Sequence, residues 1–215
     1  SRELVGGPRA RGACPASPRI GLLDTALDIA LPTLIGARID VVNLLPRGVA
    51  AAPADHGTAV ASILVGQRDT PGLLPQARLL AVAVVRQRGT VSDTTAELLI
   101  RAVDRLVQSG VAVINLSLGG PANRWLGHVL QQAGARGTAM VAAAGNGGPQ
   151  ADPVFPASHP AVLAVTAVDL ARRIDPRGQR GAHIAFAAPG VDVPVAQGGG
   201  ALAWRSGSSY AAPFV

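Results

Sequence analysis

Four polar residues, far apart in the sequence, could together carry out acyl transfer. They are Asp24, His56, Asn146 and Ser209. A serine hydroxyl becomes an effective nucleophile when a base within hydrogen-bonding distance takes its proton, and a histidine supplies such a base near neutral pH. A buried carboxylate fixes the tautomer of that histidine and stabilises the imidazolium ion. An asparagine side chain and the backbone N–H of the nucleophile can stabilise the developing oxyanion.

Each of these residues lies at one end of a predicted structural element. Asp24 follows the apolar strand RIGLL, and Asn146 follows the apolar strand AMVAAAG. His56 opens the helical segment HGTAVASILVG, and Ser209 lies at the start of a helix-like segment within SGSSYAAP. In an open parallel sheet, strand carboxyl ends and helix amino ends meet at the same edge. We therefore expect the four residues to converge at one edge of a sheet.

Short apolar runs alternate with helical patterns along the chain, which indicates an α/β fold. The runs lack polar alternation, as expected for parallel strands that are covered on both faces. We predict three layers, with a mostly parallel central sheet and helices on both sides. One helix is predicted at residues 94–109, with Thr94 and Glu97 as a capping box, and another at residues 123–135. The predicted strands are residues 19–23, 79–85, 111–116, 139–144, 161–168 and 183–187.

The N-terminal segment differs in composition from the rest of the chain. Residues 1–18 are rich in Gly, Pro and Arg, and we expect them to form a poorly ordered arm. Residues 19–215 are expected to form one domain, because 48% of the residues are hydrophobic and the length suits a single core. The one cysteine, Cys14, lies in the arm, so no intrachain disulfide is possible and we assign this thiol no catalytic role.

Five segments resemble, in this order, the diagnostic segments of the subtilisin-like serine proteases. They read IGLLDTALD, DHGTAVASILVG, VINLSLGG, VAAAGN and SGSSYAAP, and the resemblance extends from about residue 19 to the end of the chain. It implies the subtilisin-like fold and a serine endopeptidase that acts through an acyl-enzyme. By position it implies that Asp24 is the triad acid, His56 the general base and Ser209 the nucleophile. Asn146 matches the side-chain donor of the oxyanion hole.

The resemblance also implies two segments that bind the substrate. One matches the edge segment that pairs with an extended substrate backbone, and the other forms the opposite wall of the primary specificity pocket. Both segments are small and uncharged, which favours an apolar residue before the scissile bond. The residues expected to bind substrate are Leu116, Ser117, Leu118, Gly119, Gly120, Ala143, Ala144 and Gly145.

Two departures from the family pattern bear on the site. Asp55 stands directly before His56, where glycine is common, and its carboxylate could raise the pKa of His56 if it pointed inward. The chain ends at Val215, six residues after Ser209, whereas the family's nucleophile helix continues and several tens of residues follow. The resemblance therefore predicts that the C-terminal part of the family domain is absent from this chain.

Charge and composition narrow the range of partners. The formal charge of +6 comes from nineteen arginines and thirteen acidic residues. The arginines are scattered apart from a loop cluster at residues 172–180, and no basic helix is present, so we interpret them as a solvated surface and expect no nucleic-acid partner. No run reaches the ~18 apolar residues that a membrane span needs. We expect protein or peptide substrates in extended conformation, and no metal or cofactor.

The resemblance also bears on location. Members of the family are mostly exported with a propeptide, which implies an extracellular or periplasmic location and a propeptide as a possible partner. The N-terminus of this chain has no apolar signal-peptide segment.

The same residues allow other interpretations. An α/β-hydrolase esterase would have its residues in the order Ser, acid, His, whereas this chain has Asp, His, Ser. A non-catalytic peptide-binding module, or a fragment that needs a missing C-terminal segment, stays open as an alternative function. Ser208 is better placed than Ser209 to cap a helix. The remaining histidines are interpreted as structural or surface residues: His128, His159 and His183.

Overall fold

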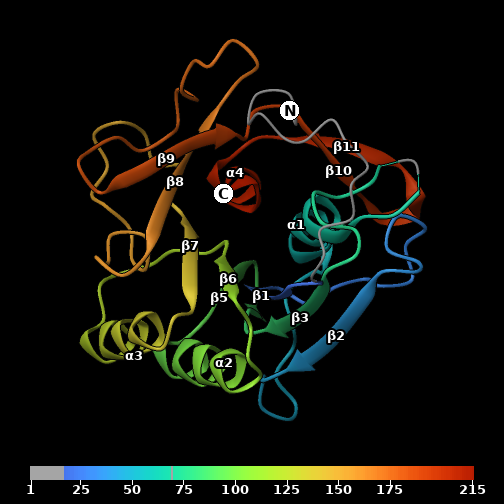
Figure 1. Cartoon of the computed structure of the whole chain (residues 1–215), viewed down its shortest axis with the longest axis horizontal. Helices are drawn as coiled ribbons and strands as arrows, with labels where there is room; N and C mark the ends of the chain where they lie inside the picture. The colour runs from blue at the N-terminus through green and yellow to red at the C-terminus, as the bar shows by residue number, and fades with distance from the viewer. Residues whose placement is uncertain (1–16, 69) are drawn as a thin grey trace.

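A computed structural model of the chain describes residues 17–68 and 70–215 (Figure 1). Most of the predicted N-terminal arm, including Cys14, lies outside the described residues. The carbonyl of Pro18 accepts a hydrogen bond from the backbone N–H of Arg78, 3.0 Å away, so the described chain enters the sheet directly.

The centre of the structure is a seven-stranded sheet in the order β2-β3-β1-β6-β7-β8-β9. Every neighbouring pair runs parallel. Because the strands are parallel, their carboxyl ends all face the same edge of the sheet. The strands are β1 (Arg19–Asp24), β2 (Arg38–Asn43), β3 (Arg78–Ala83), β6 (Val113–Leu116), β7 (Ala139–Ala143), β8 (Leu163–Val168) and β9 (Ile184–Pro189).

Helices cover both faces of this sheet, as Figure 1 shows. On one face lie α2 (Ala96–Gln108) and α3 (Arg124–Ala135), whose apolar residues share a core with alternate strand residues. On the other face lie α1 (Asp55–Val65) and the short α4 (Ser208–Ala211), which pack against the intervening strand residues. Burial on both faces explains the continuous apolar runs in the sequence.

Smaller elements surround the sheet edge. Two antiparallel hairpins pair β4 (Arg86–Arg88) with β5 (Val91–Asp93), and β10 (Val193–Ala196) with β11 (Leu202–Arg205). Short 3-10 turns occur at Gly198–Gly200 and Ala212–Phe214. The first hairpin follows β3 at its carboxyl end, so it stands beside the edge where the four candidate residues are expected.

The predicted three-layer α/β class is confirmed, and all six predicted strands are present with shifts of one or two residues at most of their ends. The sequence missed β2, an edge strand in which only Ile39 and Val42 are half-buried and the other residues are exposed. The predicted capping box was wrong. Thr95, not Thr94, caps α2 by accepting the N–H of Leu98, while the Thr94 hydroxyl donates to the carbonyl of Val84.

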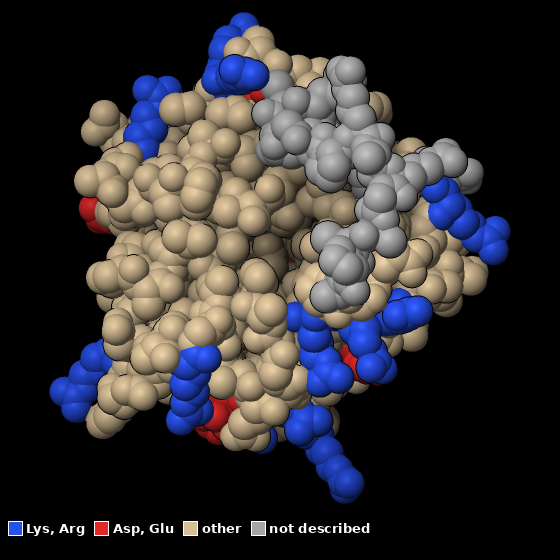
Figure 2. Space-filling view, in the orientation of Figure 1, with Lys and Arg blue, Asp and Glu red and all other residues tan. Residues whose placement is uncertain are grey.

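The surface agrees with a scattered distribution of arginine. On the face shown in Figure 2, most blue side chains lie around the edge of the molecule, and the centre is formed by uncharged residues. Among residues 17–68 and 70–215, no helix has the length and apolar character needed to cross a bilayer.

Candidate active site

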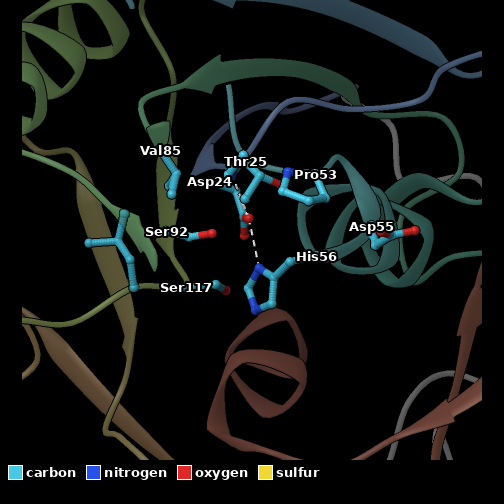
Figure 3. Close-up of a pocket in the computed structure, with 10 residues that line it drawn as sticks. Asp24, Thr25, Pro53, Asp55, His56, Val85, Ser92 and Ser117 are labelled. Atoms are coloured by element: carbon cyan, nitrogen blue, oxygen red, sulfur yellow. Dashed lines mark hydrogen bonds and ion pairs between the residues drawn. The ribbon is translucent and has the colours of Figure 1, made fainter. Parts of the chain in front are cut away.

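The carboxylate of Asp24 and the imidazole of His56 form a hydrogen-bonded pair (Figure 3). Asp24 is the last residue of β1 and its side chain is only 2% exposed. Its Oδ1 lies 2.7 Å from Nδ1 of His56 and also accepts the N–H of Thr25 at 2.6 Å. Because an ionised carboxylate only accepts hydrogen bonds, Nδ1 of His56 carries the proton. The other ring nitrogen, Nε2, is therefore available as a base.

The environment of His56 shifts its proton affinity. Burial acts to lower the pKa of His56, but the hydrogen bond to Asp24 and the charge of that carboxylate together outweigh burial, so the pKa lies above its ordinary value of 6.5. Asp55 does not contribute to this shift. Its exposed side chain points away from the imidazole in Figure 3, so the inward orientation considered from the sequence is not observed.

The connection between β1 and α1 holds the pair in place. The hydroxyl of Thr25 accepts the N–H of Gly57 at 2.9 Å, and the hydroxyl of Thr58 accepts the N–H of Asp28 at 2.8 Å. A β-carbon on Gly57 would lie 2.8 Å from the carbonyl oxygen of Thr25. Only glycine therefore allows the helix to approach the strand closely enough for His56 to reach Asp24.

Ser209 lies in α4 and is fixed by Ser117, which follows β6. The Ser117 hydroxyl donates to the carbonyl of Ser209 at 3.1 Å and itself accepts the side-chain N–H of Asn115 at 2.7 Å. In the opposite direction, the Ser209 hydroxyl donates to the carbonyl of Ser117 at 3.4 Å, which is long for an O–H···O hydrogen bond. The backbone of Ser209 is thus held firmly, while its hydroxyl is held weakly.

The structure joins Asp24 to His56 but does not join His56 to Ser209 by a hydrogen bond within the described residues. The two residues nevertheless lie on packed elements, because the ring of Tyr210, next to Ser209, lies 5.7 Å from the His56 ring. A rotation about χ1 of Ser209 is the simplest change that would turn its hydroxyl from Ser117 towards the imidazole. Such hydrogen bonds are often formed fully only when substrate is bound.

Asn146 follows β7 and lies beside the start of α4. Its Oδ1 accepts the N–H of Ser208 at 2.9 Å, and this contact orients the amide, because a backbone N–H can face only the oxygen. The Nδ2 donors of Asn146 therefore point elsewhere, and the side chain is exposed. The N–H of Ser209, the second residue of α4, has no acceptor within its own helix. The side-chain NH₂ of Asn146 and the backbone N–H of Ser209 are thus two hydrogen-bond donors beside the start of α4.

Ser208 does not cap α4, contrary to expectation. The N-cap residue is Gly207, which makes no side-chain cap, and Ser208 is completely buried. Its hydroxyl accepts the N–H of Gly145 at 3.0 Å. Ser208 therefore connects α4 to the loop that carries Asn146, by one hydrogen bond in each direction.

A loop that carries none of the predicted motifs supports the same region. The side chain of Arg177 pairs with Asp175, which is only 4% exposed, at 2.9 Å and donates to the carbonyl of Ser206 at 3.3 Å. The carbonyl of Arg177 accepts the N–H of Gly148 at 2.8 Å. This loop thus contacts both the segment before Ser208 and the segment after Asn146.

The predicted substrate-binding residues divide into two groups. Leu116, Ala143 and Ala144 are almost fully buried, so their side chains belong to the core. Ser117, Leu118, Gly119 and Gly145 lie at the sheet edge with Gly120, whose backbone is already paired in both directions with Phe155.

A pocket of about 380 Å³ opens beside the imidazole (Figure 3). The sequence had already singled out five of its lining residues and missed the others. The missed residues follow β1 or β3, precede α1, or lie in β5. Only one of them, Thr25, falls within the five diagnostic segments, and its position beside His56 is what marks it as part of the site. The missed residues are Thr25, Ala52, Pro53, Val85 and Ser92.

Comparison with known proteins identifies the group of proteins that share these features. The profile of the Peptidase S8 family, the subtilases, matches residues 20–215. A thermophilic serine proteinase of Bacillus sp. (strain AK1) is 35% identical over 206 residues, which cover 91% of this chain and 49% of that protein. Subtilisin DY of Bacillus licheniformis is 30% identical over 220 residues, which cover 96% of this chain and 77% of that protein.

Solved structures show the same architecture. A mutant of the protease domain of PatA superposes with a TM-score of 0.81 at 34% identity, over 91% of this chain and 75% of that domain. The prenylagaramide maturation protease PagA superposes with a TM-score of 0.79 at 33% identity, over 92% of this chain and 72% of that protease. The chain spans about half the length of the Bacillus AK1 proteinase.

Proposed function

The chain belongs to the subtilase family, and from this premise we propose that it is a serine endopeptidase domain with Asp24, His56 and Ser209 as its triad. The observation that carries the proposal is the 2.7 Å contact between Asp24 and His56, on a helix that packs beside the helix of Ser209. A buried carboxylate that holds a histidine next to a serine has the parts that nucleophilic acyl transfer requires.

The proposed reaction begins with proton transfer from Ser209 to His56. The Ser209 Oγ attacks the carbonyl carbon of the scissile bond while Nε2 of His56 takes the hydroxyl proton. The carboxylate of Asp24 stays ionised and stabilises the imidazolium ion. His56 then donates this proton to the leaving amine, and an acyl-enzyme remains. Water, activated by the same imidazole, hydrolyses the ester and restores the hydroxyl.

The developing oxyanion is proposed to lie between Asn146 and the N–H of Ser209. Both donors are held in advance: Asn146 by the N–H of Ser208, and Ser209 by the hydroxyl of Ser117. Donors fixed before the reaction cost no reorganisation when charge develops on the substrate oxygen.

We expect Asn146→Ala to lower kcat by about 10²–10³-fold, because one oxyanion donor is lost. The substitution also removes the acceptor for the N–H of Ser208. Asn146→Asp separates the two effects, since it keeps an oxygen for Ser208 but offers no N–H to the oxyanion. An equally large loss in this variant, measured with a peptide substrate, is the expected result.

A matched control for this prediction is Asn123→Ala. Asn123 caps α3 by accepting the N–H groups of Trp125 and Leu126, so its loss should destabilise the fold by about 1 kcal/mol without lowering kcat. A full kcat in Asn146→Asp would contradict the role given to Asn146.

Substrates are proposed to bind as an extended strand along residues 117–119. Leu118 and Gly119 make no backbone hydrogen bond within the described chain, whereas the N–H and carbonyl of Gly120 are both hydrogen-bonded to Phe155. A free segment of this kind can add a peptide strand through main-chain hydrogen bonds. Protein or peptide substrates, a propeptide as partner and an extracellular or periplasmic location complete the proposal, on the basis of family membership.

The alternative function is a peptide-binding module that does not cleave. This alternative is favoured by one observation: the Ser209 hydroxyl donates its hydrogen bond to Ser117 and not to His56. A fluorophosphonate probe distinguishes the two functions, because only a serine activated by a base reacts with it.

We expect a fluorophosphonate to label the wild-type chain on Ser209 and not to label Ser209→Ala. Ser109→Ala serves as the control, because Ser109 is a half-buried residue that ends α2, its hydroxyl donates to the carbonyl of Arg105, and its loss should leave labelling intact. The adduct is located by mass spectrometry of the peptide that contains Ser209. Labelling of the Ser209→Ala variant would refute the assignment of Ser209 as the nucleophile. A wild-type chain that folds but is not labelled would favour the peptide-binding module.

A further inference from the structure

One methyl group of Val154 lies between the two segments that flank the proposed scissile bond. Its Cγ2 atom lies 2.9 Å from the position that a β-carbon on Gly119 would take, and 3.3 Å from the corresponding position on Gly145. The same methyl therefore touches the backbone of both segments. At that depth, the space between them is already filled.

Val154 cannot easily withdraw from this position. The next residue, Phe155, is buried and exchanges two backbone hydrogen bonds with Gly120, at 2.8 and 2.9 Å. The carbonyl of Val154 accepts the N–H of Ser158 at 2.9 Å, and its side chain is half-buried against the core beneath α2 and α3. These backbone hydrogen bonds and the packing against the core hold the side chain of Val154 in place.

The opposite wall is also fixed. Gly145 has a φ of +106°, a conformation that side chains rarely adopt, and a β-carbon there would lie 3.2 Å from the carboxamide carbon of Gln179. Gln179 is 1% exposed and donates from Nε2 to the carbonyl of Asp152 at 2.7 Å. The wall cannot move back without displacing a buried, hydrogen-bonded side chain.

We propose that Val154 closes the primary specificity pocket, so that the enzyme cleaves after small residues: glycine, alanine or serine. This inference rests on the proposed function, because it places the scissile carbonyl between Ser209 and Asn146. The side chain before that bond then enters the space between residues 117–119 and Gly145. Its depth is limited by the methyl groups of Val154, and a leucine or phenylalanine side chain overlaps them.

The inference is tested with peptidyl phosphonates that differ only in the side chain next to the phosphorus. These compounds need the nucleophile and the pocket but no turnover. A difference of one methylene in such a pocket is worth about 10–200-fold, so the alanine analogue should inactivate the enzyme at least about 100-fold faster than the phenylalanine analogue. Equal rates, or a faster phenylalanine analogue, overturn the inference.

Variants of Val154 identify the residue responsible. Val154→Ala removes two methyl groups from the pocket. In this variant the rate of inactivation by the phenylalanine phosphonate, divided by the rate with the alanine phosphonate, should therefore rise at least about 10-fold. Val154→Thr has nearly the same shape as valine and should keep the wild-type ratio. A ratio that stays unchanged in Val154→Ala contradicts the assignment, even if the wild type prefers alanine.

The same experiment separates this inference from the function on which it depends. A small fluorophosphonate does not need the pocket and reports only on Ser209. Absence of fluorophosphonate labelling refutes the proposed function. Labelling by the fluorophosphonate without faster reaction of the alanine phosphonate refutes the role of Val154 and leaves the proposed function standing.

Discussion

Replacing His56 by alanine is expected to lower kcat by about 10⁶-fold, the loss that the same kind of change causes in subtilisin. The imidazole is the base that the proposed reaction assigns to Ser209. Its Nδ1 is held by Asp24 at 2.7 Å, which leaves Nε2 for the hydroxyl proton. Without this base, the hydroxyl is too weak a nucleophile at neutral pH. Single-turnover cleavage of a peptide measures the effect.

The double variant provides the sharper form of this test. Residues that act as one unit are not additive, so His56→Ala combined with Ser209→Ala should be no slower than either single variant. Additive losses would mean that the two side chains act independently, as the hydrogen bond of the Ser209 hydroxyl to Ser117 instead of His56 would suggest. His128→Ala, an exposed change on α3, is the control and should retain full activity.

Asp24→Asn is expected to lower kcat by about 10⁴-fold with little change in the fold. The Oδ1 atom of Asp24 accepts from both Thr25 and His56, while Oδ2 is buried without a hydrogen-bond partner among the described residues. An asparagine could keep both acceptor contacts only by burying its NH₂ group without a partner. In the other orientation it donates towards Nδ1 and favours the wrong tautomer of His56.

The pH dependence of this variant follows from the causes of the His56 shift. In the wild type, the hydrogen bond to Asp24 and the charge of Asp24 outweigh burial and raise the pKa of His56 above 6.5. Since the base must be neutral, kcat/KM should fall as the pH drops through this raised pKa. In Asp24→Asn only burial remains, which lowers the pKa, so the acidic limb should move to lower pH. A limb that stays in place, or moves upward, contradicts this account.

Much of the site was predictable because it depends on local patterns. The apolar strand before Asp24, the strand before Asn146 and the helix that starts near His56 are each encoded within about ten residues. Parallel strands then bring their carboxyl ends to one edge, whatever the length of the connections. Family resemblance assigned the roles, and the structure places Asp24 and His56 in contact.

Other features could not be read from local patterns. Which threonine caps α2 depends on the position of Val84, ten residues away from Thr94, because the Val84 carbonyl takes the Thr94 hydroxyl and leaves Thr95 to cap. The outward direction of Asp55 depends on how α1 packs on the sheet. Patterns report the average preference of a residue type, and a specific contact overrides it.

The sequence by itself therefore determined the layered α/β fold and the positions along the chain of Asp24, His56, Asn146 and Ser209. Only the tertiary structure decided how these residues are supported and what fits beside them. Ser117 and Ser209 are 92 residues apart, yet each accepts a hydrogen bond from the other. Val154 contacts both Gly119, 35 residues before it, and Gly145, nine residues before it. Close packing makes such contacts decisive, because a single methyl group can fill or open a pocket.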